Sequence, residues 1–337
     1  MTTHMVEDTP GIHHVTGIVG DAQSNLDFYA GVLGLRLVKR TVNYEDVLRH
    51  HLYYGNGDAS LGTLLTSFPY PGDPPGRLGK PQVAAVAFVV PPDSLDYWAD
   101  RLAAQGIDAR YRERFDERVL RFEDPDGTRV ELVTGESPID PWASGPIPVG
   151  SAIRGIHGVT TLPANPYATA STLETLGFDL VGEEPDPADE GGSNGDVADG
   201  DERGTRVRYR TSGEAATVVD VLDRDSPYGR EGPGTLHHVA VRVGEEADLF
   251  EWHDLFRERD YAVSRVRDRY YYRSIYVRGP GGVLFELATE GPGLTVDEPV
   301  EALGSSLVLP DWAEEDREMI ESQLPAIDPP RPGDGRQ

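Results

Sequence analysis

Hydrophobic and polar positions along the chain follow two periods. Apolar residues at every second position predict strands, and apolar residues three or four positions apart predict amphipathic helices. The helical pattern occurs at residues 24–33, 93–105, 167–176 and 247–259, with Asp93 as the expected N-cap of the second helix. Strand-like runs and turn signals separate these segments. The pattern therefore predicts an α+β protein.

The same order of elements recurs because the sequence repeats itself. Three pairs of segments align: GIHHVT (11–16) with GIHGVT (155–160), AAVAFVV (84–90) with HHVAVRV (237–243), and GTRVELVTG (127–135) with GGVLFELAT (281–289). The period is about half the chain, and each half holds two smaller units. We predict four βαβββ modules in two tandem domains, each module a curved mixed sheet with a helix on its outer face.

Breaks in the repeat predict the domain boundaries. The expected segments are an N-terminal tail (1–10), a first domain (11–136), a linker (137–152), a second domain (153–293) and a C-terminal tail (294–337). The linker is rich in proline and glycine. Residues 183–204, rich in acids and glycine, are expected to form a solvated loop inserted into the third module. A short acidic helix at 311–323 is expected to pack on the body or to cover a cavity.

The charge balance is strongly acidic, with 58 acids against 31 lysines and arginines and a net charge of -27. Such a charge repels nucleic acid and anionic membranes, so we expect neither as a partner. The acids are spread along the whole chain, and their mutual repulsion is screened in concentrated salt. We therefore predict a halophilic protein of a salty cytoplasm; the alternative is an acidic interaction surface.

Other features of composition limit the class of protein. No apolar run approaches the ~18 residues of a membrane span, and the start of the chain lacks the features of a signal peptide. We therefore expect a soluble cytoplasmic protein. The absence of cysteine excludes disulfides, thiolate metal ligands and thiol nucleophiles.

A single acid, Glu286, lies in the apolar run at 281–289. A buried carboxylate needs a cationic partner, because losing its hydration is costly. His14 and His238 lie at related strand positions of other modules, where their repeat counterparts are Gly158 and Ala85. Two histidines and one carboxylate with open positions suit Fe(II). The alternative for each histidine is a hydrogen-bonded core residue.

Thr66 occupies the position on the closing strand of the first module that corresponds to Glu286. A carboxylate there would give the two-carboxylate site that suits a hydrolytic or isomerase metal. The neutral threonine leaves three ligands, and so leaves room for a substrate and O2 together.

These motifs resemble a known family. The chain resembles the vicinal oxygen chelate superfamily of glyoxalases, bleomycin resistance proteins and extradiol dioxygenases. The motifs that carry this resemblance are HHVT in the first strand, HHVA in the opening strand of the fourth module, LFELAT in its closing strand, and the segments NLDFYAGVLGLRLVKRTVN and HLYYG of the first module. Within it, the chain looks like the ring-cleaving dioxygenases of the hydroquinone-cleaving branch. The resemblance covers about residues 11–293. It implies that His14, His238 and Glu286 bind Fe(II), with Mn(II) as a substitute, in a cavity shared by the first and fourth modules, while the second and third form a metal-free cavity.

The resemblance also implies a set of residues around the metal. These are Tyr276, Arg269, His237, Thr16 and His13. Counting residues along the hairpin is ambiguous by one position, so strand alternation does not decide which face of the sheet Tyr276 lies on. By the same count, His13 and His237 fall on the helix-packed side, where a purely structural role is the alternative.

Three other histidines carry weaker signals. His50 and His51 begin a strand near the expected cavity, but we do not expect a catalytic role for either. His253 lies in a predicted helix and is most simply a surface residue.

The expected function is that of a non-heme Fe(II) extradiol-type dioxygenase, which opens a hydroquinone- or catechol-type aromatic diol with O2. Arg269 would stabilise negative charge, and Tyr276 or a histidine would accept a proton. The alternatives are a glyoxalase-type metal-dependent isomerase or lyase, and a metal-free protein that binds a drug and so confers resistance. The sequence leaves the substituents of the ring and the formation of a homo-oligomer open.

Overall fold

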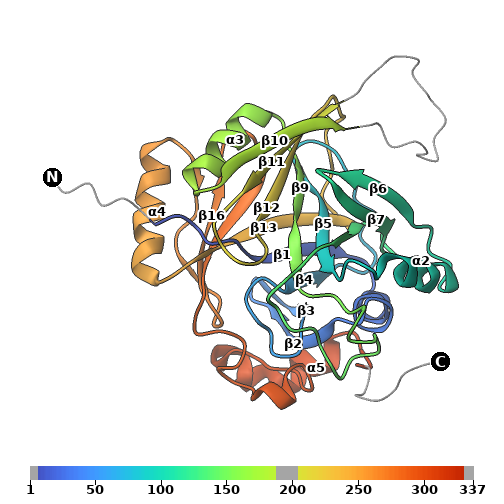
Figure 1. The fold of residues 1–337 in the computed structure, drawn as a ribbon. Helices are drawn as coiled ribbons and strands as arrows, with labels where there is room; N and C mark the ends of the chain where they lie inside the picture. The colour runs from blue at the N-terminus through green and yellow to red at the C-terminus, as the bar shows by residue number, and fades with distance from the viewer. Residues whose placement is uncertain (1–6, 187–203, 330–337) are drawn as a thin grey trace.

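The computed structural model describes residues 7–186 and 204–329 (Figure 1). The first module contains β1 (Ile12–Val19), α1 (Ala22–Leu26), the π-helix η1 (Asp27–Val32), β2 (Arg36–Asn43), β3 (Asp46–Gly55) and β4 (Leu64–Pro69). The second contains β5 (Gln82–Val90), α2 (Leu95–Ala104), β6 (Arg110–Arg114), β7 (Glu117–Glu123) and β8 (Arg129–Thr134).

The second half of the chain repeats this order. The third module contains β9 (Ile156–Leu162), α3 (Pro166–Thr175), β10 (Asp179–Asp186), β11 (Gly204–Arg210) and β12 (Val218–Asp223). The fourth contains β13 (Thr235–Val243), α4 (Glu246–Glu258), β14 (Ala262–Val263), β15 (Arg267–Asp268), β16 (Arg273–Arg278) and β17 (Leu284–Thr289). The predicted α+β fold with four βαβββ modules is confirmed.

Each module has the same strand order. Its opening strand pairs in parallel with its closing strand, as β1 does with β4 and β13 with β17. The closing strand then pairs antiparallel with the strand before it. The same pairings hold in the second and third modules. A parallel pair needs a crossover connection, and the helix of each module provides it.

Pairs of modules join through their opening strands. β1 pairs antiparallel with β13, and β5 pairs antiparallel with β9. The first and fourth modules therefore share one sheet, and the second and third share another, with a single link between Leu236 and Val83 (Figure 1). Each sheet combines modules from opposite halves of the sequence. The boundaries of the two predicted domains stay a prediction.

Alternation along the strands separates the core from the site. Val239 and Val241 of β13 are buried in the main hydrophobic cluster with Trp252 and Phe256 of α4. Because successive side chains of a strand point to opposite faces, this packing leaves His238 on the face away from the helix. The period of two in β13 and the helical spacing in α4 therefore aim His238 at the concave side of the sheet.

Two local expectations need correction. Ser94, not Asp93, is the N-cap residue of α2, and its hydroxyl donates to the carbonyl of Pro91. Residues 183–186 belong to β10 rather than to a solvated loop, because buried Asp186 accepts hydrogen bonds from Arg206 and so extends the strand. The remaining part of the predicted loop, 187–203, lies outside the described residues.

The C-terminal segment packs on the first module. It contains η2 (Val300–Ala302), η3 (Asp311–Asp316) and α5 (Arg317–Gln323), so the helix predicted at 311–323 begins as a 3-10 helix. A small apolar cluster joins it to β2, and the segment lies beside β2 and β3 at the bottom of Figure 1. Residues 137–152 contain neither helix nor strand, as expected of a linker.

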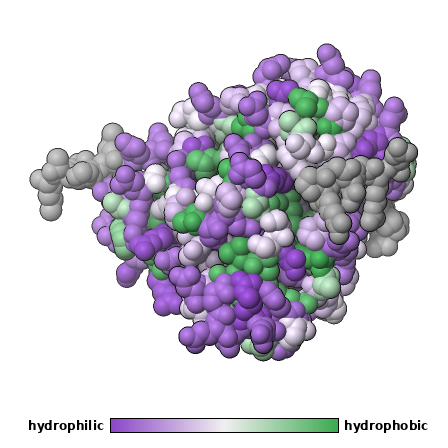
Figure 2. Space-filling model, turned by 90° about the horizontal axis from the view of Figure 1, so that it is seen from below, coloured by the Kyte–Doolittle hydropathy of each residue, from purple (hydrophilic) through white to green (hydrophobic). Residues whose placement is uncertain are grey.

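The surface carries no extended apolar region on the face drawn in Figure 2, where hydrophobic side chains form small groups among hydrophilic ones. Among the residues described, no helix is long and apolar enough to cross a membrane.

Candidate metal centre

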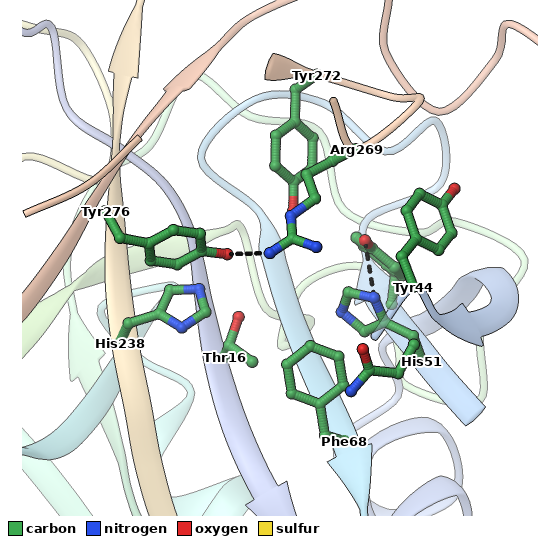
Figure 3. A pocket seen from close by; sticks show the side chains of 10 residues that line it. Thr16, Tyr44, His51, Phe68, His238, Arg269, Tyr272 and Tyr276 are labelled. Carbon is green, nitrogen blue, oxygen red and sulfur yellow. Dashed lines mark hydrogen bonds between the residues drawn. The ribbon is translucent and has the colours of Figure 1, made fainter. Parts of the chain in front are cut away.

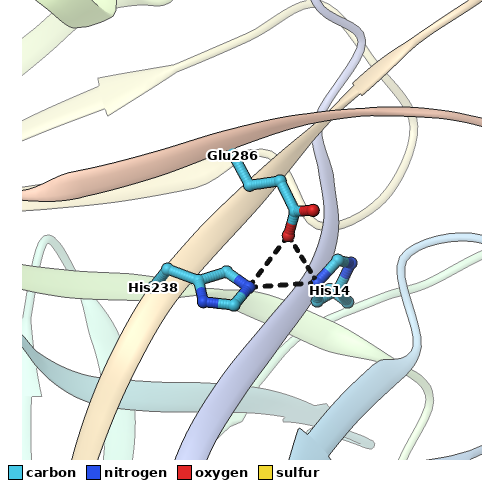
Figure 4. A group of neighbouring side chains, drawn as sticks. All are labelled: His14, His238 and Glu286. Atoms are coloured by element: carbon cyan, nitrogen blue, oxygen red, sulfur yellow. Dashed lines mark hydrogen bonds and ion pairs between the residues drawn. The ribbon is translucent and has the colours of Figure 1, made fainter. Parts of the chain in front are cut away.

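His14, His238 and Glu286 converge from three neighbouring strands (Figure 4). His14 on β1 lies opposite Ala240 on β13, and Ala240 lies beside Glu286 on β17. His238 is two residues before Ala240 and therefore shares its face. The small side chain of Ala240 leaves space between the three polar groups, and the sheet register brings their tips together.

The three donor atoms form a compact triangle. Oε2 of Glu286 lies 3.0 Å from Nε2 of His14 and 2.9 Å from Nε2 of His238, and the two Nε2 atoms are 3.3 Å apart. An ion about 2.1 Å from each atom would separate them by about 3.0 Å at right angles and by about 3.4 Å in a tetrahedron. The observed distances of 2.9 to 3.3 Å agree with this range to about 0.1 Å, so the three side chains can hold one metal ion with little movement.

Burial and charge also fit a cation. Glu286 is fully buried, and its Oε1 atom has no hydrogen-bond partner. Burial would raise the pKa of Glu286, but the adjacent imidazoles outweigh burial and hold that pKa well below its usual range. Burial lowers the pKa of His238 to about 4, so its imidazole is neutral at pH 7. A buried, ionised carboxylate next to two imidazole nitrogens is an arrangement that suits a bound cation.

Each histidine of the triad is contacted by the histidine that precedes it. Nδ1 of His14 lies 2.9 Å from Nδ1 of His13, and Nδ1 of His238 lies 2.7 Å from Nδ1 of His237. Metal binding through Nε2 requires the proton of the ligand ring on Nδ1, which then donates to the neighbouring ring. Burial lowers the pKa of His13 to about 3, so His13 is neutral and can accept this hydrogen bond. These contacts fix the tautomer that a metal needs.

Two β-bulges explain how adjacent histidines meet. The pairing of β1 with β13 contains two register shifts. One lies between Ile12 and His14 and makes His13 the extra residue of β1; the other lies between Leu236 and His238 and makes His237 the extra residue of β13. A bulge adds one residue to a strand and re-aims its side chain. Simple alternation therefore does not describe His13 and His237, whose rings reach the ligands instead of only packing beneath the helices.

A small cavity of about 330 Å³ opens beside the triad (Figure 3). Its lining residues are Thr16, Asn43, Tyr44, His51, Tyr53, Phe68, His238, Arg269, Tyr272 and Tyr276. This space includes some that is open to solvent, and its wall is rich in aromatic rings. The cavity therefore suits a small, flat ligand with one end at His238.

Tyr276 and Arg269 lie over this end of the cavity. Tyr276 pairs with Glu286 across β16 and β17, and its hydroxyl accepts a hydrogen bond of 3.2 Å from Nη2 of Arg269. Figure 3 shows the two groups pointing toward each other above Thr16. Burial, followed by the charge of Glu286, raises the pKa of Tyr276. The direction of Tyr276, which alternation left open, is thus toward the cavity.

Sequence reasoning missed most of the opposite wall. His51 and Tyr53 lie two residues apart on β3, and Phe68 on β4 faces them. Their period of two was a readable signal, because it places His51 and Tyr53 on one face. His50 points elsewhere and hydrogen-bonds to the carbonyl of Pro325. His253 lies on α4 beside Asp254, away from the triad.

The equivalent place between the second and third modules is filled by ion pairs. Glu131 corresponds to Glu286 by strand register, because it pairs with Ala87 as Glu286 pairs with Ala240. Arg114 and Arg121 contact its two carboxylate oxygens at 2.6 and 2.9 Å. Asp220, which corresponds to Thr66, is held by Arg206 and Arg208. Guanidinium groups thus replace the cation there. In the part of the chain that the structure describes, His14, His238 and Glu286 are the one group suited to a metal.

Comparison with known proteins identifies the family. Residues 11–132 and 173–287 match the family described as the Glyoxalase/Bleomycin resistance protein/Dioxygenase superfamily. The chain belongs to this superfamily. The resemblance noted from the sequence motifs is therefore confirmed.

Members of the superfamily with similar sequences are named as ring-cleaving enzymes. The chain is 39% identical to the "Putative ring-cleaving dioxygenase MhqO" of Bacillus subtilis, over 95% of this chain and 97% of the relative. It is 34% identical to the chlorohydroquinone/hydroquinone 1,2-dioxygenase of Sphingobium indicum, over 89% and 91% of the two chains.

Solved structures of the superfamily share the fold. A crystal structure of a "putative dioxygenase" from Bacillus subtilis superposes with a TM-score of 0.87 at 38% identity, covering 96% of this chain and 99% of the other. Glyoxalase I from Zea mays superposes with a TM-score of 0.60 at 14% identity, over 83% and 92% of the two chains. The second likeness shows the fold alone.

Proposed function

We propose that the protein is a ring-cleaving dioxygenase of the extradiol type, which uses Fe(II) and O2 to open an aromatic diol. The observation that carries the proposal is the triangle of two imidazoles and one carboxylate beside a small aromatic cavity. Two histidines and one carboxylate leave half of an octahedral coordination sphere open, which suits Fe(II) and O2 chemistry. The named activities of MhqO and of the Sphingobium relative support the same reaction.

Bound Fe(II) would supply the electron exchange with O2 that the ring opening requires. The protein supplies position and charge. His14, His238 and Glu286 hold the ion, and the cavity holds the ring against His238. Arg269 places a fixed positive charge next to the Tyr276 hydroxyl, where a diol oxygen would lose its proton and become negative. The role of Arg269 and Tyr276 is to bind that oxygen and stabilise its negative charge.

The favoured substrate is a hydroquinone-type diol. The Sphingobium relative is named for chlorohydroquinone and hydroquinone. The cavity is consistent with this class, since it is small and its far wall carries the flat rings of His51 and Phe68 at a centroid distance of 4.2 Å. A catechol-type diol is the alternative within the same reaction class.

A glyoxalase-type isomerase or lyase is the second candidate, because the fold of maize glyoxalase I is similar. Thr66 argues against it. Its neutral hydroxyl takes the position of a further carboxylate and hydrogen-bonds to Thr16. Retention of all three metal-binding side chains argues against a metal-free drug-binding protein.

Oxygen uptake tests the proposal directly. The metal-free protein is loaded with Fe(II) under anaerobic conditions and then mixed with O2 and a panel of hydroquinones and catechols. We expect O2 consumption with a diol, and both atoms of 18O2 in the ring-opened product. The Glu286→Gln variant should keep its circular dichroism spectrum and lose both iron and oxygen uptake.

Two results would contradict the proposal. One is oxygen uptake by an iron-free Glu286→Gln protein. The other is an iron-loaded wild type that consumes no O2 with any diol but converts a hemithioacetal, which would establish the isomerase.

A further inference from the structure

A chain of hydrogen bonds runs along the cavity wall and ends at Thr16, opposite His238 in the sheet. The Tyr53 hydroxyl lies 3.1 Å from Nδ1 of His51, and Nε2 of His51 lies 3.1 Å from Oγ1 of Thr66. Oγ1 of Thr66 lies 2.8 Å from Oγ1 of Thr16. All four side chains are buried, and Thr16 lies opposite the metal ligand His238 in the β1–β13 register.

The direction of this chain is set by the imidazole in its middle. Burial lowers the pKa of His51 well below its ordinary value, so the ring is neutral, with one donor and one acceptor nitrogen. If Nδ1 accepts, Nε2 donates to Thr66, and the Thr66 hydroxyl then donates to Thr16. If Nδ1 carries the proton, every hydrogen bond reverses, and the Thr16 hydroxyl donates to Thr66.

The Tyr53 end favours the first direction. A phenol is a stronger hydrogen-bond donor than the N–H of a neutral imidazole, and an imidazole nitrogen is a good acceptor. Hydrogen bonds arranged head to tail also polarise and strengthen one another.

The last hydroxyl then has only one place to donate. Among the described residues, Oγ1 of Thr16 hydrogen-bonds only to Thr66. In the favoured direction, Thr16 accepts that bond, and its own hydrogen is left for the cavity. Figure 3 shows the Thr16 oxygen pointing toward the space between His238, Tyr276 and Arg269.

We infer that His51 and Thr66 are positioning residues, which force the Thr16 hydroxyl to donate a hydrogen bond to an oxygen atom held at the metal. The acceptor is an anionic oxygen of the ligand, either the deprotonated diol or reduced O2. The identity of this acceptor rests on the proposed function, whereas the direction of the chain does not. The inference gives His51 a role that its sequence context alone did not predict.

The tautomer of His51 is the first test. The metal-free protein is labelled with 15N in its histidines, and long-range 1H–15N correlation spectra distinguish a protonated Nε2 from a protonated Nδ1. His51→Gln assigns the His51 signals among those of the nine histidines. We expect the proton on Nε2. A proton on Nδ1 would overturn the inference, and this result does not depend on any activity.

Kinetics of Thr66 variants are the second test. Thr66→Val is nearly isosteric and removes the hydroxyl, whereas Thr66→Ser retains it. We expect Thr66→Val to lower kcat about 10- to 100-fold with unchanged iron content, and Thr66→Ser to retain most of the wild-type rate. Thermal unfolding of both variants establishes that each is folded at the assay temperature.

A double-mutant cycle separates positioning from packing. If Thr66 acts through Thr16, Thr66→Val should have no further effect on kcat in a Thr16→Val protein. An equal loss in both backgrounds, or a wild-type rate for Thr66→Val, would contradict the inference. If the wild type consumes no O2 with any diol, the proposed function fails, and the tautomer measurement still decides the direction of the chain.

Discussion

Two glutamates at equivalent positions of the repeat have opposite environments. Glu131 is contacted by Arg114 and Arg121, whereas Glu286 is contacted by two imidazoles. Burial opposes ionisation of both acids. For Glu131 the adjacent arginines outweigh burial and hold its pKa below the ordinary value. Comparing the two glutamates therefore shows how much a charged partner adds to stability when a carboxylate is buried.

We predict that Glu131→Gln destabilises the metal-free protein more than Glu286→Gln does. Removing one partner of a buried ion pair leaves the other uncompensated, which costs about 3–5 kcal/mol, and the guanidinium partners of Glu131 are always charged. Glu286 contacts imidazoles instead, and an imidazole can lose its proton when the carboxylate is removed, so its replacement should cost less. Urea unfolding of the three metal-free proteins at pH 7 measures both changes. A larger loss in Glu286→Gln than in Glu131→Gln would contradict this account.

The effect of Glu131 should depend on pH. Because the folded-state pKa of Glu131 is below the unfolded value of about 4.3, its stabilisation is fully present above that pH and is lost as the pH falls through the folded value. The stability difference between wild type and Glu131→Gln should therefore be constant from pH 6 to 7 and shrink below about pH 4. A difference that grew with acidification would show that the arginines do not hold the charged form.

Tyr276→Phe is predicted to lower kcat by about 100-fold with unchanged iron content. The substitution removes the hydroxyl that accepts the Arg269 hydrogen bond and lies beside the metal ligands, but it keeps the ring that packs on His238. Tyr228→Phe, at a tyrosine that is 73% exposed, is the matched control and should leave kcat and iron content unchanged. Iron analysis and single-turnover rates make the comparison. Loss of iron in Tyr276→Phe would assign the hydroxyl to metal binding instead.

At the scale of elements, alternation predicted the strands and the ligand face but not the bulges. The period of two put His14, His238 and Glu286 on one side of the sheet, because the pairing is regular from His14 to Thr16, from His238 to Ala240 and along β17. The bulges at His13 and His237 insert one residue each, and nothing in the local composition marks them. They follow from how β1 and β13 fit together, which is a property of two distant segments.

Long-range pairing also explains the other differences from the sequence predictions. Residues 183–186 have a loop-like composition, but Asp186 is held by Arg206, which is separated from it by 187–203. His51 was discounted because its partners Thr66 and Tyr53 become significant only when β3 and β4 lie side by side. Single-sequence patterns therefore predict elements well and side-chain networks between elements poorly.

The C-terminal segment is held to β2 by a buried lysine. Nζ of Lys39 is fully buried and lies 2.5 Å from carboxylate oxygens of both Asp297 and Glu298. Asp297 also accepts a hydrogen bond from Tyr271, the neighbour of the cavity residue Tyr272. This cluster links the last part of the chain to the wall of the cavity.

We predict that Lys39→Met lowers the free energy of unfolding by about 3–5 kcal/mol, since it leaves the buried carboxylate of Glu298 and the half-buried one of Asp297 without this cation. It should also speed proteolysis within 294–329, because the segment loses its anchor. Lys80→Met is the control: Lys80 is the other lysine of the chain, is half-buried and forms no ion pair within the described residues. Equal protease resistance of the two variants would contradict an anchoring role.

At the scale of the whole molecule, the pairing of modules decides which residues can meet. The repeat makes all four modules similar, so local pattern alone cannot tell whether the first pairs with the second or with the fourth. In the structure β1 joins β13, and His14 meets ligands that are more than 200 positions away, as the 224-residue separation from His238 shows. The other pair, β5 with β9, brings together arginines and acids instead. One sheet thus gains the candidate metal site and the other an ion-pair network.

The net charge of -27 also acts on the whole molecule, and it predicts stabilisation by salt. Self-repulsion of the folded chain is a sum over many acids at moderate distances. At 0.1 M ionic strength the Debye length is about 10 Å, and at 1 M it is about 3 Å, so most of these interactions disappear between the two. We predict that the Tm at pH 7 rises as KCl increases from about 0.1 to about 1 M, with most of the rise at the lower concentrations.

The same titration near the isoelectric point separates screening from other effects of salt. The pI is about 4.6, so near pH 5 the acids and bases nearly balance and little net repulsion remains to be screened. The KCl dependence of the Tm should therefore be much weaker at pH 5 than at pH 7. A Tm that is independent of KCl at pH 7 would contradict adaptation to salt and favour an acidic surface for binding. An equal rise at both pH values would point to exclusion of salt from the protein surface, since that effect does not require net charge.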